Sequence, residues 1–209
     1  MQIESIKNII FDLGNVIINI DPELSVKAMS ELGFLDFDKS YSLLSQSKLF
    51  DSLEKGRISP EKFYAEINLQ LNKKVSSEKI NKAWGAMLLD FPKQRIDLLQ
   101  RLAKKYRLFL LSNTNIIHFH QYNNDLEKQF GFGLNSLFEK AYYSFDLGMR
   151  KPDADIFEYV LDDSDLNPFE TVFIDDLDKN IDVAGRMGLN TFWMDVANGD
   201  DIIQKLNDF

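Results

Sequence analysis

Three acidic residues lie at the ends of apolar runs, where their carboxylates could do chemistry. Asp12 follows the run over residues 9–11 and stands on a turn before Gly14. In that position a carboxylate can be a nucleophile, a metal ligand or both. Asp175 and Asp176 end a later apolar run and offer further oxygen ligands. Hard oxygen ligands of this kind suit magnesium.

Groups that could bind the oxygens of a phosphate occur elsewhere in the chain. Ser112 and Asn113 provide a hydroxyl, an amide and backbone N–H groups, and Lys151 provides a compact positive charge. Pro152 follows Lys151 and fixes the turn there. Phosphoryl transfer needs an in-line nucleophile, a divalent cation and donors around the equatorial oxygens. Together with the acidic residues, these groups form a candidate set for that chemistry.

The short apolar runs before these residues have the pattern of buried parallel strands. The expected strands cover residues 9–11, 108–111, 171–174 and 191–194. Helical spacing of apolar residues predicts helices over 95–106, 155–161 and 180–187. Alternation of strands and helices predicts an α/β fold with a Rossmann-like parallel sheet covered on both faces. Ligands bind such sheets outside the carboxyl ends of the strands, where the candidate residues fall.

The stretch over residues 21–90 differs because it has a helical pattern throughout. The expected helices cover residues 22–32, 38–49, 59–71 and 76–88. Ser59 and Pro60 are a good start signal for one of them, with serine as N-cap and proline at the first helical position. We therefore expect a discontinuous catalytic core of residues 1–20 and 91–209, with residues 21–90 inserted as a helical cap.

The composition limits the kinds of binding partner and the cellular location that we expect. The formal charge of −9 disfavours nucleic acid and anionic membrane surfaces, which need a basic face. Cysteine is absent, which excludes thiolate catalysis, and only two histidines are present, His118 and His120, which disfavours a histidine-rich metal site. A signal peptide and a membrane-spanning run are not apparent. We expect a cytoplasmic protein, monomeric by default, that binds a small phosphorylated metabolite.

Four short motifs in order resemble those of the haloacid dehalogenase superfamily. They are Phe-Asp-Leu-Gly-Asn-Val at 11–16, Leu-Leu-Ser-Asn-Thr-Asn at 110–115, Arg-Lys-Pro-Asp at 150–153, and Phe-Ile-Asp-Asp at 173–176 followed by Asn180. The insertion after the first motif is similar to the branch with a helical cap. Within it, the chain resembles bacterial sugar-1-phosphate phosphatases, which share Asp-Leu-Gly-Asn-Val and Asp-Leu-Gly-Met-Arg-Lys-Pro.

The resemblance implies a magnesium-dependent phosphatase that works through an aspartyl-phosphate on Asp12. It implies three groups of site residues: magnesium ligands, residues that hold the transferring phosphoryl group, and residues that orient ligands or waters. In that order, they are Asp12, Asp176 and the backbone carbonyl of Gly14; Ser112, Asn113 and Lys151; and Asp175 and Asn180.

Gly14 departs from the family's common Asp-x-Asp pattern. The second aspartate of that pattern protonates the leaving oxygen and later activates water, and glycine can do neither. Loss of a general acid typically costs a factor of about 10² to 10⁴ in rate. An anomeric hydroxyl is more acidic than an ordinary alcohol, so Gly14 points to substrates such as sugar 1-phosphates.

Two other functions use the same residues. A 2-haloacid dehalogenase would attack carbon with Asp12 and need no metal, but Asp175 and Asp176 would crowd such a site with negative charge. Dehalogenases also place a halide-binding arginine early in the cap, whereas the first arginine here is Arg57. The other alternative is a catalytically weak regulatory or binding module, which the retention of Lys151 with the acidic residues disfavours.

Overall fold

A parallel β-sheet lies at the centre of the structure, a computed structural model that describes residues 3–34, 37, 48–207 and 209. The strand order is β3-β2-β1-β4-β5. The strands are β1 (Asn8–Phe11), β2 (Arg107–Ser112), β3 (Lys140–Tyr143), β4 (Thr171–Asp175) and β5 (Asn190–Trp193). In the central register Ile10 pairs with Phe109 on one side and with Phe173 on the other. The carboxyl ends of β2, β1 and β4 therefore meet at one edge.

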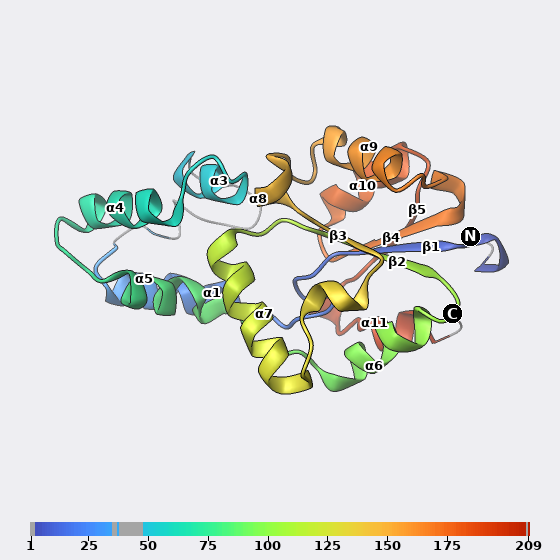
Figure 1. The fold of residues 1–209 in the computed structure, drawn as a ribbon, viewed down its shortest axis with the longest axis horizontal. Coiled ribbons are helices and arrows are strands. Elements are labelled where there is room, and N and C mark those ends of the chain that lie inside the picture. Colours follow the sequence, from blue (N-terminus) through green and yellow to red (C-terminus); the bar gives the residue numbers. More distant parts are fainter. Residues whose placement is uncertain (1–2, 35–36, 38–47, 208) are drawn as a thin grey trace.

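Both faces of the sheet are covered, because side chains alternate along each buried strand. Ile9 and Phe11 of β1 pack into one hydrophobic cluster, whereas Ile10 packs into a second cluster with Phe109 and Phe173. Helices α9 (Ala154–Asp163) and α10 (Asp178–Arg186) lie on one side of the sheet, and α6 (Lys93–Leu102) and α11 (Ile202–Lys205) on the other (Figure 1). The observed architecture is the predicted α/β fold.

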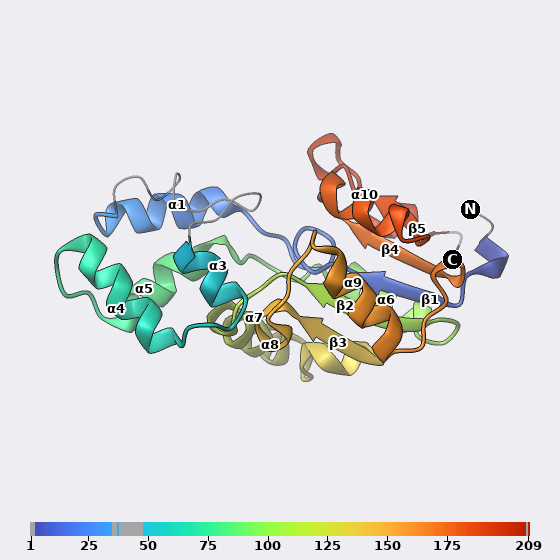
Figure 2. The same ribbon diagram turned by 90° about the horizontal axis from the view of Figure 1, so that it is seen from above.

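The helices inserted after β1 lie beyond the edge of the sheet at which the strands end (Figures 1 and 2). They are α1 (Pro22–Glu31), α3 (Lys48–Glu54), α4 (Pro60–Leu71) and α5 (Ser77–Trp84). An aromatic cluster joins α3, α4 and α5, in which the ring of Phe50 lies 5.1 Å from that of Trp84 and 5.6 Å from that of Phe63. These contacts support the division into core and cap, which stays a prediction.

Most of the predicted elements are present, with shifted ends. The start signal at Ser59 is confirmed, because its side chain accepts a hydrogen bond from the backbone N–H of Lys62. The helix predicted over 76–88 is shorter in the structure. Helix α5 ends at Trp84, and a 3-10 turn, Gly85–Met87, follows it. Most of the helix predicted over 38–49 lies outside the described residues, and α3 extends past the predicted end at residue 49.

Four elements of the core were missed. Helix α7 (Ile116–Phe130), strand β3, helix α8 (Ser144–Leu147) and helix α11 were not predicted from the sequence. The four-residue strand β3 begins with the exposed Lys140, so it lacks the continuous apolar run of a central strand. Among the described residues, no helix is both long enough and apolar enough to span a membrane.

The predicted cap approaches the predicted core closely just after α3 ends. Gly56 has a φ of +60°, and a Cβ atom at this position would lie 2.1 Å from the backbone oxygen of Phe145 in α8. The chain needs glycine here for two independent reasons, its left-handed backbone and the space occupied by a backbone carbonyl. Gly131 has a φ of +82° and no atom within 4 Å of its Cβ position, so it isolates the first reason.

We expect Gly56→Ala to destabilise the protein more than Gly131→Ala. A left-handed non-glycine residue costs about 1–2 kcal/mol, and Gly131→Ala pays only that cost. Gly56→Ala must also move α3 away from α8. Urea denaturation of both variants measures the difference in unfolding free energy. Equal losses in the two variants would show that the cap does not rest on the core at this point.

Candidate active site

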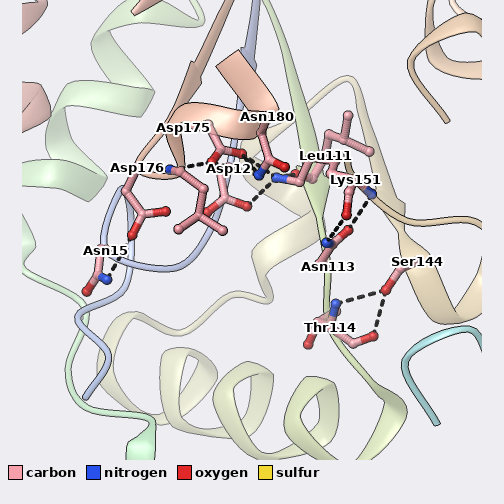
Figure 3. Close-up of polar contacts among 11 residues, drawn as sticks. Asp12, Asn15, Leu111, Asn113, Thr114, Ser144, Lys151, Asp175, Asp176 and Asn180 are labelled. Carbon is pink, nitrogen blue, oxygen red and sulfur yellow. Dashed lines mark hydrogen bonds and ion pairs between the residues drawn. The ribbon is translucent and has the colours of Figure 1, made fainter. Parts of the chain in front are cut away.

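Asp12 is held by the pairing of β1 with β4 and by a buried cation. It directly follows β1, and its backbone N–H donates to the carbonyl of Ile174 at 2.8 Å. One carboxylate oxygen, Oδ1, accepts a hydrogen bond from Lys151 Nζ at 2.6 Å (Figure 3). The sheet and the ammonium together fix the carboxylate at the edge where the strands end.

The ammonium of Lys151 is fully engaged by protein groups. Its Nζ donates to Asp12 and to Asp175 Oδ2, each at 2.6 Å, and to the carbonyl of Leu111 at 2.8 Å. A lysine ammonium has three donors, so all of them are used. The amide of Asn113 donates to the Lys151 carbonyl at 2.8 Å and accepts from the Lys151 N–H at 2.9 Å. Lys151 is therefore positioned at both its backbone and its head group.

The carboxylate of Asp175 is also saturated. Besides Lys151, it accepts from the backbone N–H of Leu177 at 2.8 Å. Asn180 Nδ2 lies 2.9 Å and 3.0 Å from its two oxygens. A carboxylate offers about four lone-pair sites, and these four contacts occupy them. Asp175 thus has little capacity left for a cation, although it lies within the acidic cluster, and its position suits the orientation of Lys151.

Asp176 lies beside Asp12 and is held from the first loop. Asn15 Nδ2 donates to Asp176 Oδ2 at 3.0 Å (Figure 3). Asn15 has a φ of 56°, a left-handed conformation that asparagine tolerates better than most residues. Oxygens of Asp12, Asp175 and Asp176 all lie within 4.8 Å of one another. Three carboxylates therefore share one small volume.

Burial and crowding raise the pKa values of two of these carboxylates. Burial raises the pKa of Asp12 to about 7, with Lys151 opposing it and the charges of Asp175 and Asp176 adding to it. Burial likewise raises the pKa of Asp176 to about 6, against the hydrogen bond from Asn15. For the Lys151 ammonium, burial acts to lower the pKa, but Asp12 and Asp175 outweigh it and the pKa is raised. One ammonium does not balance three carboxylates, so a further cation is favoured.

A hard divalent cation fits these residues. The Lys151 contact uses Oδ1 of Asp12, which leaves its second oxygen, and the Asp176 carboxylate lies beside it. Gly14 lines the same pocket, and its backbone carbonyl could act as a ligand. Asn180 Oδ1 is buried and has no hydrogen-bond partner among the described residues, so it can accept from a water in the cation's coordination shell. These oxygens suit magnesium.

The loop after β2 forms the wall next to Lys151. Asn113 and Thr114 line the pocket, and Ser144 fixes this loop by accepting from the Thr114 N–H at 2.9 Å and donating to its carbonyl at 2.8 Å. The Asn113 side chain is committed to Lys151, so its backbone is what remains for a phosphoryl group. Ser112 ends β2 and is buried, but it is not among the residues that line the pocket.

The structure brings the other predicted residues together. Asp12, Gly14, Asn113, Lys151, Asp175, Asp176 and Asn180 line this one pocket. At Gly14, a Cβ atom would lie 2.9 Å from Ile20 Cδ1 and 3.9 Å from Asp12 Oδ2. Ile20 therefore fills the space into which a second aspartate would begin to extend.

Several lining residues were not assigned a role from the sequence. Glu54 comes from the predicted cap, and Arg150 precedes Lys151. Asn15 follows Gly14 and does not line the pocket, but it holds Asp176 and was not assigned a role either. His118 also lines the pocket; burial lowers its pKa to about 4, and its ring stacks on Trp84 at 4.6 Å. Arg150 and Asn15 stand inside the quoted motifs, so their positions were a usable signal. Glu54 has no such signal, because only the packing of the cap brings it to the site.

Comparisons with known proteins agree with this site. A family model described as haloacid dehalogenase-like hydrolase matches residues 6–188. The chain is 33% identical over 201 residues to D-ribitol-5-phosphate phosphatase of Bacteroides thetaiotaomicron, covering 96% of this chain and 97% of that protein. It is 27% identical to glyceraldehyde 3-phosphate phosphatase of Methanocaldococcus jannaschii, covering 89% of this chain and 83% of that protein.

A crystal structure of a haloacid dehalogenase family enzyme from Bacteroides thetaiotaomicron has the same fold. It superposes with a TM-score of 0.87 at 36% identity, covering 90% of this chain and 94% of that one. That enzyme is an aspartate-to-alanine variant in complex with magnesium and inorganic phosphate. The family model and the relatives span most of the sequence, and the chain therefore belongs to the haloacid dehalogenase-like hydrolase family.

Proposed function

We propose that the chain is a magnesium-dependent phosphatase that cleaves a small phosphorylated metabolite through an aspartyl-phosphate on Asp12. The observation that carries this proposal is the buried Lys151 ammonium, 2.6 Å from both Asp12 and Asp175, with Asp176 completing the acidic cluster. The named relatives act on ribitol 5-phosphate and glyceraldehyde 3-phosphate, and a similar enzyme binds magnesium and phosphate. These likenesses support both the reaction and the cofactor.

In the first step, the Asp12 carboxylate attacks phosphorus in line with the ester bond. A bond forms between the Asp12 oxygen and phosphorus, and the bond from phosphorus to the leaving alcohol breaks. Lys151 and the backbone N–H bond to Ile174 hold Asp12 so that the attack needs little reorientation. In the second step, water attacks the phosphorus of the acyl phosphate, inorganic phosphate leaves, and the carboxylate is restored.

The residues around Asp12 are suited to hold the proposed cofactor, Mg²⁺. Asp12, Asp176 and the Gly14 carbonyl would hold Mg²⁺, with Asp175 and Asn180 behind them to orient Lys151 and a water. Bound there, the cation stabilises the negative charge of the transferring phosphoryl group. Backbone N–H groups of the loop at Asn113 would bind the remaining oxygens. The family resemblance also implies the Ser112 hydroxyl and Lys151, but here Ser112 does not line the pocket and the three Lys151 donors go to protein acceptors.

The first oxygen to leave receives no proton from residue 14, because Gly14 has no side chain. We therefore propose that water delivers this proton and that substrates with acidic leaving groups react fastest, as a sugar 1-phosphate would. The side chain next to Gly14 is that of Ile20, which is apolar and cannot donate a proton. The relative that acts on ribitol 5-phosphate, an ester of a primary alcohol, makes this preference worth measuring directly.

The two alternative functions fit the site less well. A metal-free dehalogenase would leave Asp12, Asp175 and Asp176 within 4.8 Å with one ammonium to balance them. A purely regulatory module would not need Lys151 to be held at its backbone and its head group. The net charge of −9 supports the expectation that the protein binds neither nucleic acid nor anionic membranes, and a cytoplasmic monomer stays a proposal.

We expect Asp12→Asn to abolish phosphatase turnover with p-nitrophenyl phosphate, since the amide is not a nucleophile. Asp178→Asn is the matched control, because Asp178 is an exposed acid at the start of α10 that does not line the pocket. The control should retain wild-type turnover, which should disappear with EDTA and return with Mg²⁺. Turnover by Asp12→Asn, or full wild-type activity in EDTA, would contradict the proposal.

The leaving-group preference is tested with two esters of one sugar. We expect kcat/KM for glucose 1-phosphate to exceed that for glucose 6-phosphate, by up to the roughly 10² to 10⁴ that a general acid contributes. Both esters carry hydroxyl groups on the same ring, so the acidity of the leaving oxygen is the main chemical difference between them. Equal values for the two esters would mean that a proton donor other than bulk water replaces the missing aspartate.

A further inference from the structure

An ion pair joins the cap to the core at the pocket. Arg150 Nη2 lies 3.2 Å from Glu54 Oε2, and the two side chains are 14% and 7% exposed. Glu54 ends α3, and Arg150 stands in the loop that leads to Lys151. Both residues line the same pocket as Asp12. Among the pocket-lining residues of the described chain, Glu54 is the one that comes from the predicted cap.

The ion pair of Glu54 with Arg150 is not expected to contribute much to the stability of the fold. Burial of two charges costs several kcal/mol in desolvation, and apolar residues of similar size often serve packing as well or better. Arg150 Nε is buried and has no hydrogen-bond partner among the described residues. A buried donor left in that state is unfavourable unless something else uses it. The arrangement therefore points to a ligand that meets the guanidinium.

Other contacts also hold the predicted cap against the core. Gly56 packs against the Phe145 carbonyl, and Asp51 of α3 lies 3.8 Å from Arg150 Nη1. Asp51 shares the charged cluster with Glu54, but it does not line the pocket. The predicted cap is therefore held to the core by contacts other than the pair of Glu54 with Arg150.

The position of the pair relative to Asp12 decides what it could recognise. The proposed phosphoryl site lies where β1, β2 and β4 end, whereas Glu54 enters the pocket from α3 of the cap. Arg150 immediately precedes Lys151, whose backbone is clamped by Asn113. The guanidinium is thus attached next to the proposed phosphoryl site, and the part of the substrate beyond phosphorus would extend toward it.

We propose that Glu54 and Arg150 are specificity residues that bind hydroxyl groups of the leaving alcohol, so that the substrate is a sugar or polyol phosphate. This inference rests on the proposed phosphatase function. A hydroxyl is both donor and acceptor, so it can donate to the Glu54 carboxylate and accept from the Arg150 guanidinium. An apolar alcohol would leave both charged groups buried and unsolvated, and sites of this kind reject such analogues strongly.

The test compares substrates that differ in hydroxyl groups. The kcat/KM values for ribitol 5-phosphate, glucose 1-phosphate and p-nitrophenyl phosphate are measured for wild type, Glu54→Ala, Glu54→Gln and Asp51→Asn. We expect Glu54→Ala to lower the ratio of the better hydroxylated substrate to p-nitrophenyl phosphate by about 10- to 100-fold, the range for one lost hydrogen bond to a charged group. Glu54→Gln keeps an acceptor and should recover part of the ratio.

Asp51→Asn is the matched control, since it removes an acid from the same helix and the same charged cluster. It should leave the ratio at the wild-type value. Equal losses on all substrates in Glu54→Ala would assign the pair to cap docking and overturn the inference, as would an unchanged ratio in both Glu54 variants. If the wild type hydrolyses none of these esters with Mg²⁺, the proposed phosphatase function itself fails, which is a distinguishable result.

Discussion

The site depends on one buried ammonium. Lys151 is 1% exposed, and its three donors go to Asp12, Asp175 and the carbonyl of Leu111. These partners come from the carboxyl ends of three adjacent strands, so the ammonium joins β2, β1 and β4 at the point where they meet. Burial of a cation is tolerable only with such complete satisfaction. The double contact between Asn113 and the Lys151 backbone keeps that geometry in place.

Because Lys151 needs acceptors, Asp175 has a different role from Asp12 and Asp176, although the three aspartates look alike in the sequence. Asp175 has its lone pairs occupied by Lys151, Asn180 and the Leu177 N–H, and so it serves the ammonium. Asp12 and Asp176 keep oxygens for a cation and, in the proposed mechanism, for attack on phosphorus. Glu54 of the predicted cap completes the pocket and forms a buried ion pair with Arg150. In the proposed mechanism this pair binds the leaving group.

Much of this was predictable because strand ends carry the chemistry in parallel sheets. The apolar runs before Asp12, Ser112 and Asp175 indicated their strands, and the order of the motifs indicated the family. The individual roles were not predictable. Whether Asn113 faces a phosphate or the Lys151 backbone depends on the loop after α8, and the path of that loop is set by long-range packing. Glu54 lies about 40 residues from the nearest motif in sequence, and only the docking of α3 against α8 brings it to the pocket.

The central claim is that a protein carboxylate, and not water, makes the first attack on phosphorus. The stereochemical course of hydrolysis tests this most directly, with a phosphorothioate ester whose phosphorus is made chiral by sulfur and two oxygen isotopes, hydrolysed in water that carries the third isotope. Two successive in-line displacements, first by Asp12 and then by water, each invert the configuration. We predict net retention of configuration in the thiophosphate product. Net inversion would show a single attack by water and would contradict the account.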